Sequence, residues 1–245
     1  VSSSLKLEHR VFEFPPRLIP EPVRFANYVD AMTYKPFHIY LRNTVFLVVM
    51  NEIAVLLTAS LCAYGFARIN FAGRNFWFSI LLGVMMLPGI VLIVPNFVIF
   101  SRLKWIDTFL PLIVPPFFGG GAFNIFLLRQ FFRTIPEELA DAARIDGCSE
   151  FGIYARVMMP LAKPGLVIAI IYNAVPVWND FFFPLIFLRT PEKSPLPLAV
   201  ANFFGEHSVQ WGPLFAFLGL SILPIVLLYL LMSRYFISGM LAGTF

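Results

Sequence analysis

The hydrophobic pattern divides the chain into long apolar stretches separated by short polar segments. Five stretches have the length of a membrane-spanning helix, which needs about 20 mainly apolar residues to cross a hydrocarbon core about 30 Å thick. They cover residues 44–67, 76–100, 109–128, 164–188 and 213–232. Only two charged side chains, Glu52 and Asp180, fall inside them. The pattern therefore predicts an all-α fold, a polytopic transmembrane helical bundle with five spans.

Composition excludes the main soluble classes. Hydrophobic residues make up 59% of the 245 residues and charged residues 13%, with a mean hydropathy of +0.79. Soluble domains carry about 25% charged residues, which cover their water-facing surface. A soluble enzyme, a disordered chain and a secreted disulfide scaffold are therefore excluded, and we expect no disulfide between Cys62 and Cys148. The net charge of +4 fits basic membrane-protein loops, and no basic run alternates with aromatic residues, so we expect no nucleic-acid binding.

Helix-breaking residues interrupt several predicted spans. Such breaks are tolerated where neighbouring helices or a water-filled cavity satisfy the freed backbone groups, which favours a transporter over a simple anchor. The breaks are Pro88, Gly89, Pro95, Pro115, Pro116, Gly119–Gly121, Pro176, Pro184 and Pro224. For the run 119–121 we expect a kink or a close helix approach.

The distribution of Lys and Arg predicts the orientation. The loops after the first, third and fifth spans hold eight of them, and the alternate loops hold four, so residues 134–160 are expected in the cytoplasm. The leader, residues 1–43, carries six Lys and Arg although alternation places it outside, and it starts with Val1. We therefore expect a missing first span, which would give six in the complete protein, and treat residues 1–245 as one permease domain.

The loop 134–160 has the pattern of two short helices joined by a glycine turn. Thr134 and Glu137 have capping-box spacing, and Pro136 suits a first helical turn. Gly147 permits a turn, and Ser149 can cap a second helix. The residues Leu139, Ala142 and Ala143 share one helical face, and Phe151, Tyr154, Val157 and Met158 form an apolar stripe. On pattern alone, this hairpin either docks into another protein or lies on the membrane surface.

The spacing within this loop resembles the EAA motif of bacterial ABC importer permeases. Asp141-Ala142-Ala143 is followed after three residues by Gly147, and after nine more by the segment 157–160, Val-Met-Met-Pro. The family has Glu in place of Asp141 and Ile-x-Leu in place of Val-Met-Met. The resemblance implies a type I ABC importer permease-like fold in which the loop docks into a cytoplasmic ATPase. The coupling residues it implies are Glu138, Asp141, Ala142, Ala143, Asp146, Gly147, Phe151, Tyr154 and Pro160.

A second resemblance is to the second permease of maltose-type carbohydrate importers. It rests on the segments 178–181 (Trp-Asn-Asp-Phe), 196–199 (Leu-Pro-Leu-Ala), 211–212 (Trp-Gly) and 234–243. It implies a sugar, oligosaccharide or polyol as solute, a second permease subunit as heterodimer partner, two cytoplasmic ATPase subunits and an extracytoplasmic solute-binding protein. It also implies a bacterial or archaeal plasma membrane. We expect no cofactor on this chain, because ATP and Mg²⁺ would bind to the ATPases.

Polar residues inside the spans are candidates for the solute path. Asn124, Asn173, Trp178, Asn179 and Asp180 offer amide, indole and carboxylate groups suited to sugar hydroxyls and rings. For Asp180 and the asparagines, helix-orienting hydrogen bonds are the alternative. Glu52 is expected either to pair with Arg42 or to lie near the cavity.

The sequence thus predicts a non-catalytic ABC importer permease. No metal-ligand spacing joins His9, His38 and His207, and no catalytic set falls in a plausible pocket. Two alternatives stay open: an ion-coupled secondary transporter that uses Glu52 and Asp180 as ion sites, and a membrane-embedded scaffold whose loop recruits a partner.

Overall fold

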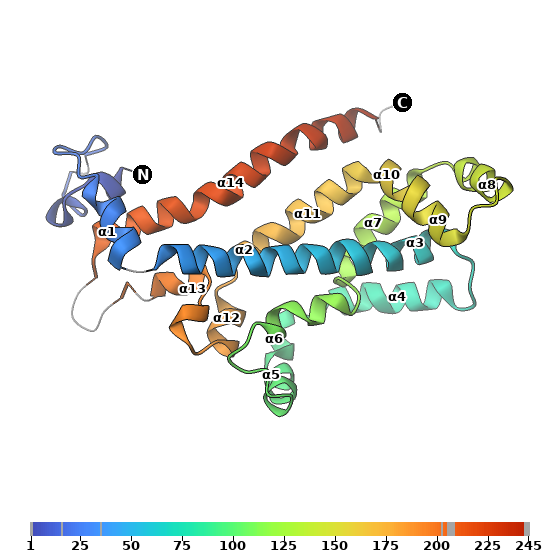
Figure 1. The fold of residues 1–245 in the computed structure, drawn as a ribbon, viewed down its shortest axis with the longest axis horizontal. Helices are drawn as coiled ribbons and strands as arrows, with labels where there is room; N and C mark the ends of the chain where they lie inside the picture. Colours follow the sequence, from blue (N-terminus) through green and yellow to red (C-terminus); the bar gives the residue numbers. More distant parts are fainter. Residues whose placement is uncertain (1, 16, 35, 202, 205–208, 243–245) are drawn as a thin grey trace.

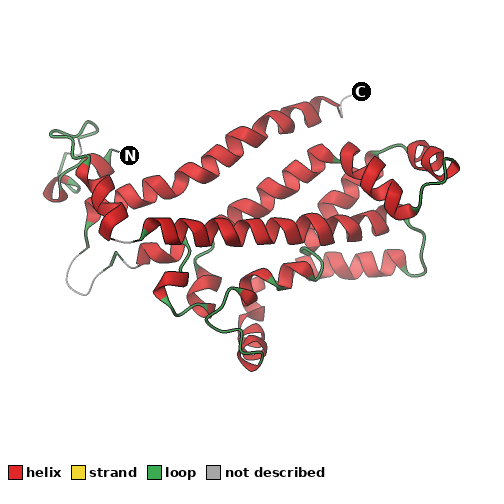
Figure 2. Cartoon of the chain, viewed as in Figure 1, coloured by secondary structure: helices red, strands yellow, loops and turns green. Residues whose placement is uncertain are grey.

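The computed structural model describes residues 2–15, 17–34, 36–201, 203–204 and 209–242. Over this part of the chain the regular elements are helices (Figures 1 and 2), apart from an isolated bridge between Phe204 and Val209. The all-α prediction is confirmed. Gly243, the last residue of the segment 234–243, lies outside the described residues.

The first predicted span belongs to one 32-residue helix, Phe37–Arg68. It joins α2 (Phe37–Ala54), the π-helical turn η3 (Val55–Ala59) and α3 (Ser60–Arg68). At 1.5 Å per residue this helix is about 48 Å long, so it crosses a bilayer core and continues beyond it. It lies at the centre of the bundle (Figure 1), where α7 packs against its α3 part and α11 and α13 against its α2 part.

The third and fifth predicted spans correspond to two further helical segments long and apolar enough to cross a membrane, Leu110–Thr134 and Trp211–Met232. The first consists of α6 (Leu110–Ile113), η5 (Pro115–Phe117) and α7 (Ala122–Thr134), and the second belongs to α14 (Trp211–Ala242).

The glycine run 119–121 both bends the chain and permits a close helix contact. All three glycines have positive φ, a conformation that a Cβ opposes. A Cβ on Gly120 would lie 2.6 Å from Cβ of Ala59 in η3. Both expectations for this run, a kink and a close approach, are confirmed.

The second predicted span is broken. Its helices α4 (Arg74–Met85) and α5 (Ile93–Arg102), with η4 (Gly89–Leu92) between them, bend by 91° where Pro88 interrupts the helix. If this pair and a second pair bent by 78°, Glu150–Leu161 with Lys163–Trp178, each count as one span, the described residues contain five.

The predicted fourth span, 164–188, is wrong at its C-terminal end. The helix α11 covers Lys163–Trp178, and a separate helix α12 covers Phe182–Phe187. The Asp180 carboxylate accepts hydrogen bonds from the backbone N–H groups of Phe182 and Phe183, at 3.1 and 3.2 Å. An aspartate that caps a new helix in this way competes with continuation of the old one.

The remaining helices lie at the two ends of the bundle. At the end that carries the predicted cytoplasmic loop these are α8 (Glu137–Ile145), α9 (Glu150–Ile153), η6 (Tyr154–Met158) and α10 (Met159–Leu161). At the other end they are η1 (Ser3–Leu5), η2 (Glu8–Arg10), α1 (Ala26–Tyr34), η7 (Pro191–Lys193) and α13 (Leu196–Ala201).

The buried side chains form two apolar clusters, one near each end. One joins η3, α3 and α7 to the loop helices, through residues such as Tyr64, Phe132 and Ile153. The other joins α1, α2, α11, α13 and α14, through residues such as Trp178 and Phe217. The loop helices are therefore packed into the bundle core.

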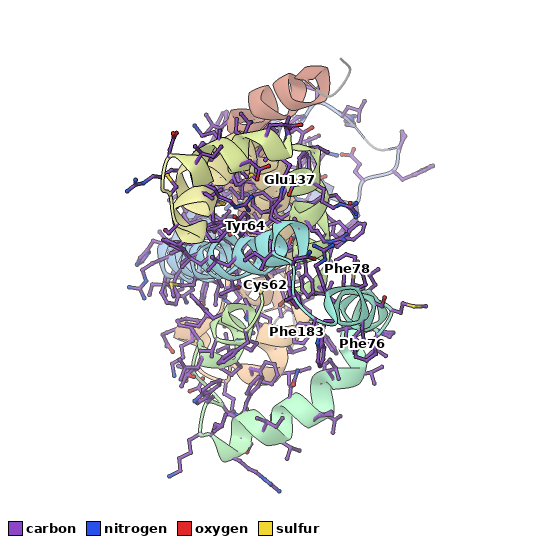
Figure 3. All side chains as sticks on the ribbon, turned by 90° about the vertical axis from the view of Figure 1, so that its right-hand side faces the viewer. Cys62, Tyr64, Phe76, Phe78, Glu137 and Phe183 are labelled. Atoms are coloured by element: carbon purple, nitrogen blue, oxygen red, sulfur yellow. The ribbon has the colours of Figure 1, made fainter. Side chains whose placement is uncertain are left out.

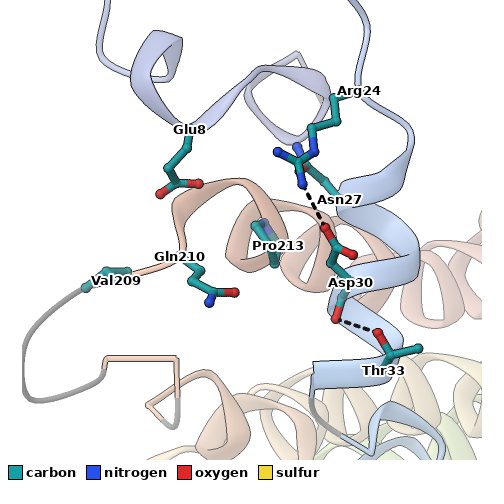
Figure 4. A pocket seen from close by; sticks show the side chains of 8 residues that line it. All are labelled: Glu8, Arg24, Asn27, Asp30, Thr33, Val209, Gln210 and Pro213. Atoms are coloured by element: carbon teal, nitrogen blue, oxygen red, sulfur yellow. Dashed lines mark hydrogen bonds and ion pairs between the residues drawn. The ribbon is translucent and has the colours of Figure 1, made fainter.

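The leader packs onto the start of α14. The Glu8 carboxylate accepts hydrogen bonds from the backbone N–H groups of Trp211 and Gly212, at 2.6 and 3.0 Å, and so caps that helix. A polar cavity of about 640 Å³ lies beside this contact (Figure 4), and the ion pair between Arg24 and Asp30 forms part of its wall. The extracytoplasmic position of residues 1–43 stays a prediction.

Candidate functional site

The loop 134–160 folds as two short helices that meet at a glycine turn. Gly147 follows α8 with φ of +81°, a left-handed conformation that a Cβ opposes, so the predicted turn is confirmed. The Ser149 hydroxyl accepts a hydrogen bond of 3.2 Å from the N–H of Gly152, which confirms Ser149 as the cap of α9. The turn and the second cap are thus those that the sequence predicts.

The predicted capping box at Thr134 is wrong. The Thr134 hydroxyl donates a hydrogen bond of 2.8 Å to the carbonyl of Phe131, within α7, and Pro136 precedes α8 without a side-chain cap. Thr134 is the last residue of α7, so its side chain reaches back into that helix.

Two hydroxyl contacts connect the loop to α3. Ser60 and Tyr64 lie one turn apart on α3, and Glu150 and Tyr154 lie one turn apart in the loop. Tyr64 donates a hydrogen bond of 2.7 Å to Oε2 of Glu150, and the hydroxyls of Ser60 and Tyr154 lie 2.7 Å apart. The two polar pairs fix the rotation of the loop on the helix.

Apolar burial reinforces this attachment. Ala140, Ile153 and Met158 of the loop are fully buried against Val55, Ala63, Leu128, Phe132 and their neighbours. Burying a side chain of the size of Ile or Met contributes roughly 1.5–3 kcal/mol relative to exposure. The loop is thus packed into the bundle against η3, α3 and α7.

A charged triad holds the two loop helices together. The Arg144 guanidinium donates hydrogen bonds of 2.6 Å to Asp141 and 2.8 Å to Glu150. The Arg144 guanidinium, and then the Tyr64 hydroxyl, lower the pKa of the Glu150 carboxyl. The carboxylates of Glu150 and Asp141 in turn raise the pKa of Arg144. Glu150 is therefore ionised at neutral pH and receives bonds from both a loop helix and a span.

The loop leaves large apolar side chains exposed at its outer surface. Ile145, just before the glycine turn, is 87% exposed, and Phe151 is 67% exposed. Figure 3 looks onto this end of the molecule, with Glu137 above Tyr64. Most residues of the predicted coupling set are exposed: Glu138, Asp141, Ala142, Asp146, Gly147, Phe151 and Pro160.

Two members of the predicted coupling set are not on this surface. Tyr154 is 7% exposed and belongs to the contact with α3, and Ala143 is half-buried. The predicted apolar face of α8 is not the buried one: its residues Leu139 and Ala142 are exposed. The buried residue of this helix is Ala140, which was not part of that face. The helix turns Ala140 towards the core, which leaves Leu139 outside.

The candidate solute-path residues do not converge on one cavity. Asn124 donates a hydrogen bond to the carbonyl of Gly120 at 2.8 Å, and Asn173 donates one to Glu52 at 2.9 Å. Trp178 donates to the carbonyl of Ser221 at 3.1 Å, and Asn179 to that of Val175 at 2.8 Å. Each of these bonds orients a helix or its end.

Two small cavities border these side chains. Asp180 and Asn51 line one of about 250 Å³, together with Pro116 and Phe183. Trp178 and Asn179 line another of about 210 Å³, between α11, α13 and α14. In this chain alone, Asp180 therefore faces one space, and Trp178 and Asn179 face another.

Glu52 pairs with Asn173 in the structure, and its Oε2 atom is buried without a hydrogen-bond partner among the described residues. The ion pair with Arg42, one of the alternatives predicted for Glu52, does not form in the described part of the chain.

Sequence reasoning missed the residues that attach the loop, namely Ser60, Tyr64, Arg68, Arg144 and Glu150. The Arg68 guanidinium donates hydrogen bonds to the carbonyls of Phe132, at 2.6 Å, and Ile135, and so ties the end of α3 to the end of α7. The available signal was the spacing of Ser60 and Tyr64, two polar groups on one face of an apolar helix.

No group of histidine, cysteine, aspartate or glutamate residues that could hold a metal ion occurs in the described ranges. Both cysteines are free thiols.

Comparison with known proteins identifies the family. Residues 55–241 match the model of the binding-protein-dependent transport system inner membrane component. The chain is 34% identical over 227 residues to the arabinooligosaccharides transport system permease protein AraQ of Bacillus subtilis (strain 168), covering 91% of this chain and 79% of that protein. It is 32% identical over 243 residues to the inner membrane ABC transporter permease protein YcjP of Escherichia coli (strain K12), covering 98% of this chain and 87% of that protein.

A solved structure has the same fold. It is a bacterial ABC transporter involved in the import of the acidic polysaccharide alginate, with a TM-score of 0.85 and 26% identity over 96% of this chain and 88% of that one. These matches favour an ATP-driven importer over the ion-coupled transporter and the scaffold. The chain belongs to the binding-protein-dependent transport system inner membrane component family, as a non-catalytic, multi-pass permease subunit of the inner membrane.

Proposed function

We propose that this permease imports a sugar or oligosaccharide, and that its loop 134–160 couples the spans to ATP hydrolysis by a partner subunit. The observation that carries the coupling is the loop itself, which is bonded to α3 through Tyr64 and Glu150 while Ile145 and Phe151 stay exposed. A rigid element with exposed apolar side chains beside a glycine turn suits insertion into a protein groove. The sugar class is supported by the names of AraQ and of the alginate importer.

The family implies a solute-binding protein and an ATPase as partners. The finer assembly is part of the proposal: a second permease subunit completes a heterodimer, and two ATPase subunits bind ATP and Mg²⁺. Closure of the ATPase dimer would move the two docked loops and switch the bundle from inward-facing to outward-facing, and hydrolysis would reset it.

The path of the movement runs through the first span. A displacement of the loop reaches α3 through the contacts of Glu150 with Tyr64 and of Tyr154 with Ser60. Because α3 continues through η3 into α2, the same helix carries the displacement to Glu52, where Asn173 of α11 is bonded. Loop movement would therefore act directly on the contact between two spans.

The solute path stays a proposal for Asn124, Asn173, Trp178, Asn179 and Asp180. Their amide, indole and carboxylate groups suit the hydroxyls and ring faces of a sugar.

Docking is tested by co-purification of the ATPase subunit with the membrane-embedded permease. We expect Ile145→Asp and Phe151→Asp each to reduce the recovered ATPase at least roughly tenfold, since an apolar anchor in an interface is worth about 2 kcal/mol or more. Ile19→Asp is the matched control, because Ile19 is 75% exposed in the leader at the other end of the molecule. Equal ATPase recovery with all three variants would disprove the docking role.

A further inference from the structure

An apolar groove lies on the outside of the bundle between α4 and α7. It has a volume of about 430 Å³, and no charged side chain lines it. Its walls include Phe66, Trp77, Ile80, Val84, Ala122 and Ile125. The α4 residues in its wall, Trp77, Ile80 and Val84, are exposed in this chain.

Three arginines gather at one end of the groove, and we name Arg74, Arg129 and Arg133 the arginine cluster. Arg74 lies one turn before Trp77 on α4, and Arg129 lies one turn beyond Ile125 on α7. Arg129 and Arg133 lie one turn apart on α7, and the Arg129 guanidinium lies over the ring of Phe78, which is one turn after Arg74 on α4. None of the three has a carboxylate within 4.0 Å in the described residues.

The position of Arg129 shows that the cluster is built into the fold. Its side chain is 9% exposed, its Nε donates to the carbonyl of Phe66 at 3.2 Å, and its guanidinium lies 3.9 Å from the centre of the Phe78 ring. The rule that cytoplasmic loops are basic requires no such burial, and it does not require three arginines to meet beside one groove. Three cations without a carboxylate partner in the described residues, next to an apolar groove, suit an anion with an apolar tail.

The dimensions fit one leaflet of a bilayer. From Arg74 to Val84 the helix rises about 15 Å, which is half of a hydrocarbon core about 30 Å thick. Phe76 and Trp77, at the arginine end, are 64% and 55% exposed, as expected for aromatic side chains at the level of lipid headgroups. Figure 3 shows Phe76 and Phe78 on α4, beside the end that carries the loop.

We propose that the groove and the arginine cluster bind an anionic phospholipid of the cytoplasmic leaflet. An acyl chain fills the groove, and the phosphate faces Arg74 and Arg133. The buried Arg129 forms the inner wall of the phosphate site. The bound lipid neutralises the cluster at the point where α3, α4 and α7 meet the loop.

Native mass spectrometry of the complete transporter tests this proposal. The complex, in a mild detergent, is incubated with equal amounts of phosphatidylglycerol and phosphatidylethanolamine. The wild-type complex should retain the anionic lipid preferentially. Each of Arg74→Gln and Arg133→Gln should reduce that retention about fivefold, since a basic residue near the surface adds about 1 kcal/mol of attraction. Ala122→Leu, which narrows the groove, should reduce retention of both lipids.

Lys163→Gln is the matched control, because Lys163 is an exposed cation at the same end but does not line the groove. It should leave lipid retention unchanged. Equal retention of the two lipids by the wild type, or an equal loss with Lys163→Gln, would overturn the proposal. Release of the second permease subunit by the arginine variants would also overturn it, because it would show that a protein helix occupies the groove.

Discussion

The hydroxyl of Tyr64, on a membrane-spanning helix, donates a hydrogen bond of 2.7 Å to the carboxylate of Glu150, in the loop that carries the EAA-like spacing. The other oxygen of the same carboxylate accepts a bond of 2.8 Å from Arg144. One carboxylate therefore joins both loop helices to the span. A loop held in this way transmits a push from a docked subunit, whereas a flexible loop would absorb it.

The Glu150 contact gives coupling a defined pH dependence. Because Arg144 and Tyr64 hold the pKa of Glu150 below its usual value of 4.5, the ionised contact is fully present above that value and is lost as the pH falls below it. We expect ATPase co-purification with the permease to be constant from pH 8 to about 5 and to decline only below about 4.5. Glu150→Gln should weaken it at every pH, and a decline already between pH 7 and 6 would contradict this assignment.

The turn at Gly147 should tolerate residues according to their backbone preference. A Cβ added at Gly147 meets no atom within 4 Å, so the cost of a substitution comes from φ of +81°. Gly147→Asn should leave the stability of the turn nearly unchanged, and Gly147→Val should destabilise it by about 1–2 kcal/mol. The reason is that asparagine adopts the left-handed conformation far more readily than valine. Gly147→Trp adds bulk at the docking surface and should abolish ATPase co-purification. If the Asn and Val variants lose the same amount of ATPase, the turn conformation is not what matters.

The hydrogen bonds of Asp107, which we call the Asp107 clamp, join two loops at the other end of the molecule. The Asp107 carboxylate accepts bonds from the backbone N–H groups of Arg189 and Thr190, at 3.0 and 2.9 Å, and from the Thr190 hydroxyl and Lys193. The hydroxyl and the two N–H donors hold the pKa of Asp107 well below its usual range. Asp107→Asn should lower the free energy of unfolding by roughly 1–3 kcal/mol, measured by thermal unfolding of the purified complex.

Asp30→Asn is the matched control for the clamp. Asp30 forms an exposed ion pair with Arg24, and such pairs contribute about 0–1 kcal/mol. Equal shifts in the two unfolding temperatures would show that the Asp107 bonds add nothing beyond a surface charge pair.

Neutral variants of the intramembrane acids separate ATP-driven import from ion coupling. Glu52→Gln keeps an oxygen that can accept the bond from Asn173, and Asp180→Asn keeps one that can cap α12. We expect each variant to retain solute uptake within about threefold of wild type, since neither acid is proposed to carry an ion and the amide oxygen introduced by Asp180→Asn can still accept a bond from a sugar hydroxyl. Abolished uptake in either variant, with ATP hydrolysis intact, would contradict it.

The helical class, the glycine turn and the Ser149 cap were predictable because each depends on local sequence: apolar length, a residue that tolerates positive φ and a side chain that caps a helix. The end of the fourth span was not, since hydropathy continues smoothly through Phe187 while the capping bonds of Asp180 end the helix at Trp178.

The contacts that attach the loop could not be predicted for a different reason. Ser60 and Tyr64 lie 94 and 86 positions before their partners, and only the packing of α3 against α7 brings them together. The same packing turns Tyr154 inwards, although the sequence placed it with the exposed coupling residues. Pairings over such distances depend on tertiary structure, which a helical periodicity does not encode.

The coupling of import to ATP hydrolysis is measured as the number of solute molecules imported per ATP hydrolysed, in proteoliposomes that contain the whole transporter. Tyr64→Phe removes only the hydroxyl that bonds to Glu150, and Tyr172→Phe, on a half-exposed tyrosine stacked against Phe123, is the control. Tyr64→Phe should lower this ratio roughly tenfold or more while ATP hydrolysis continues, because a hydrogen bond to a charged group is worth about 1.5–3 kcal/mol. An unchanged ratio would show that force does not pass from the loop to the span through this contact.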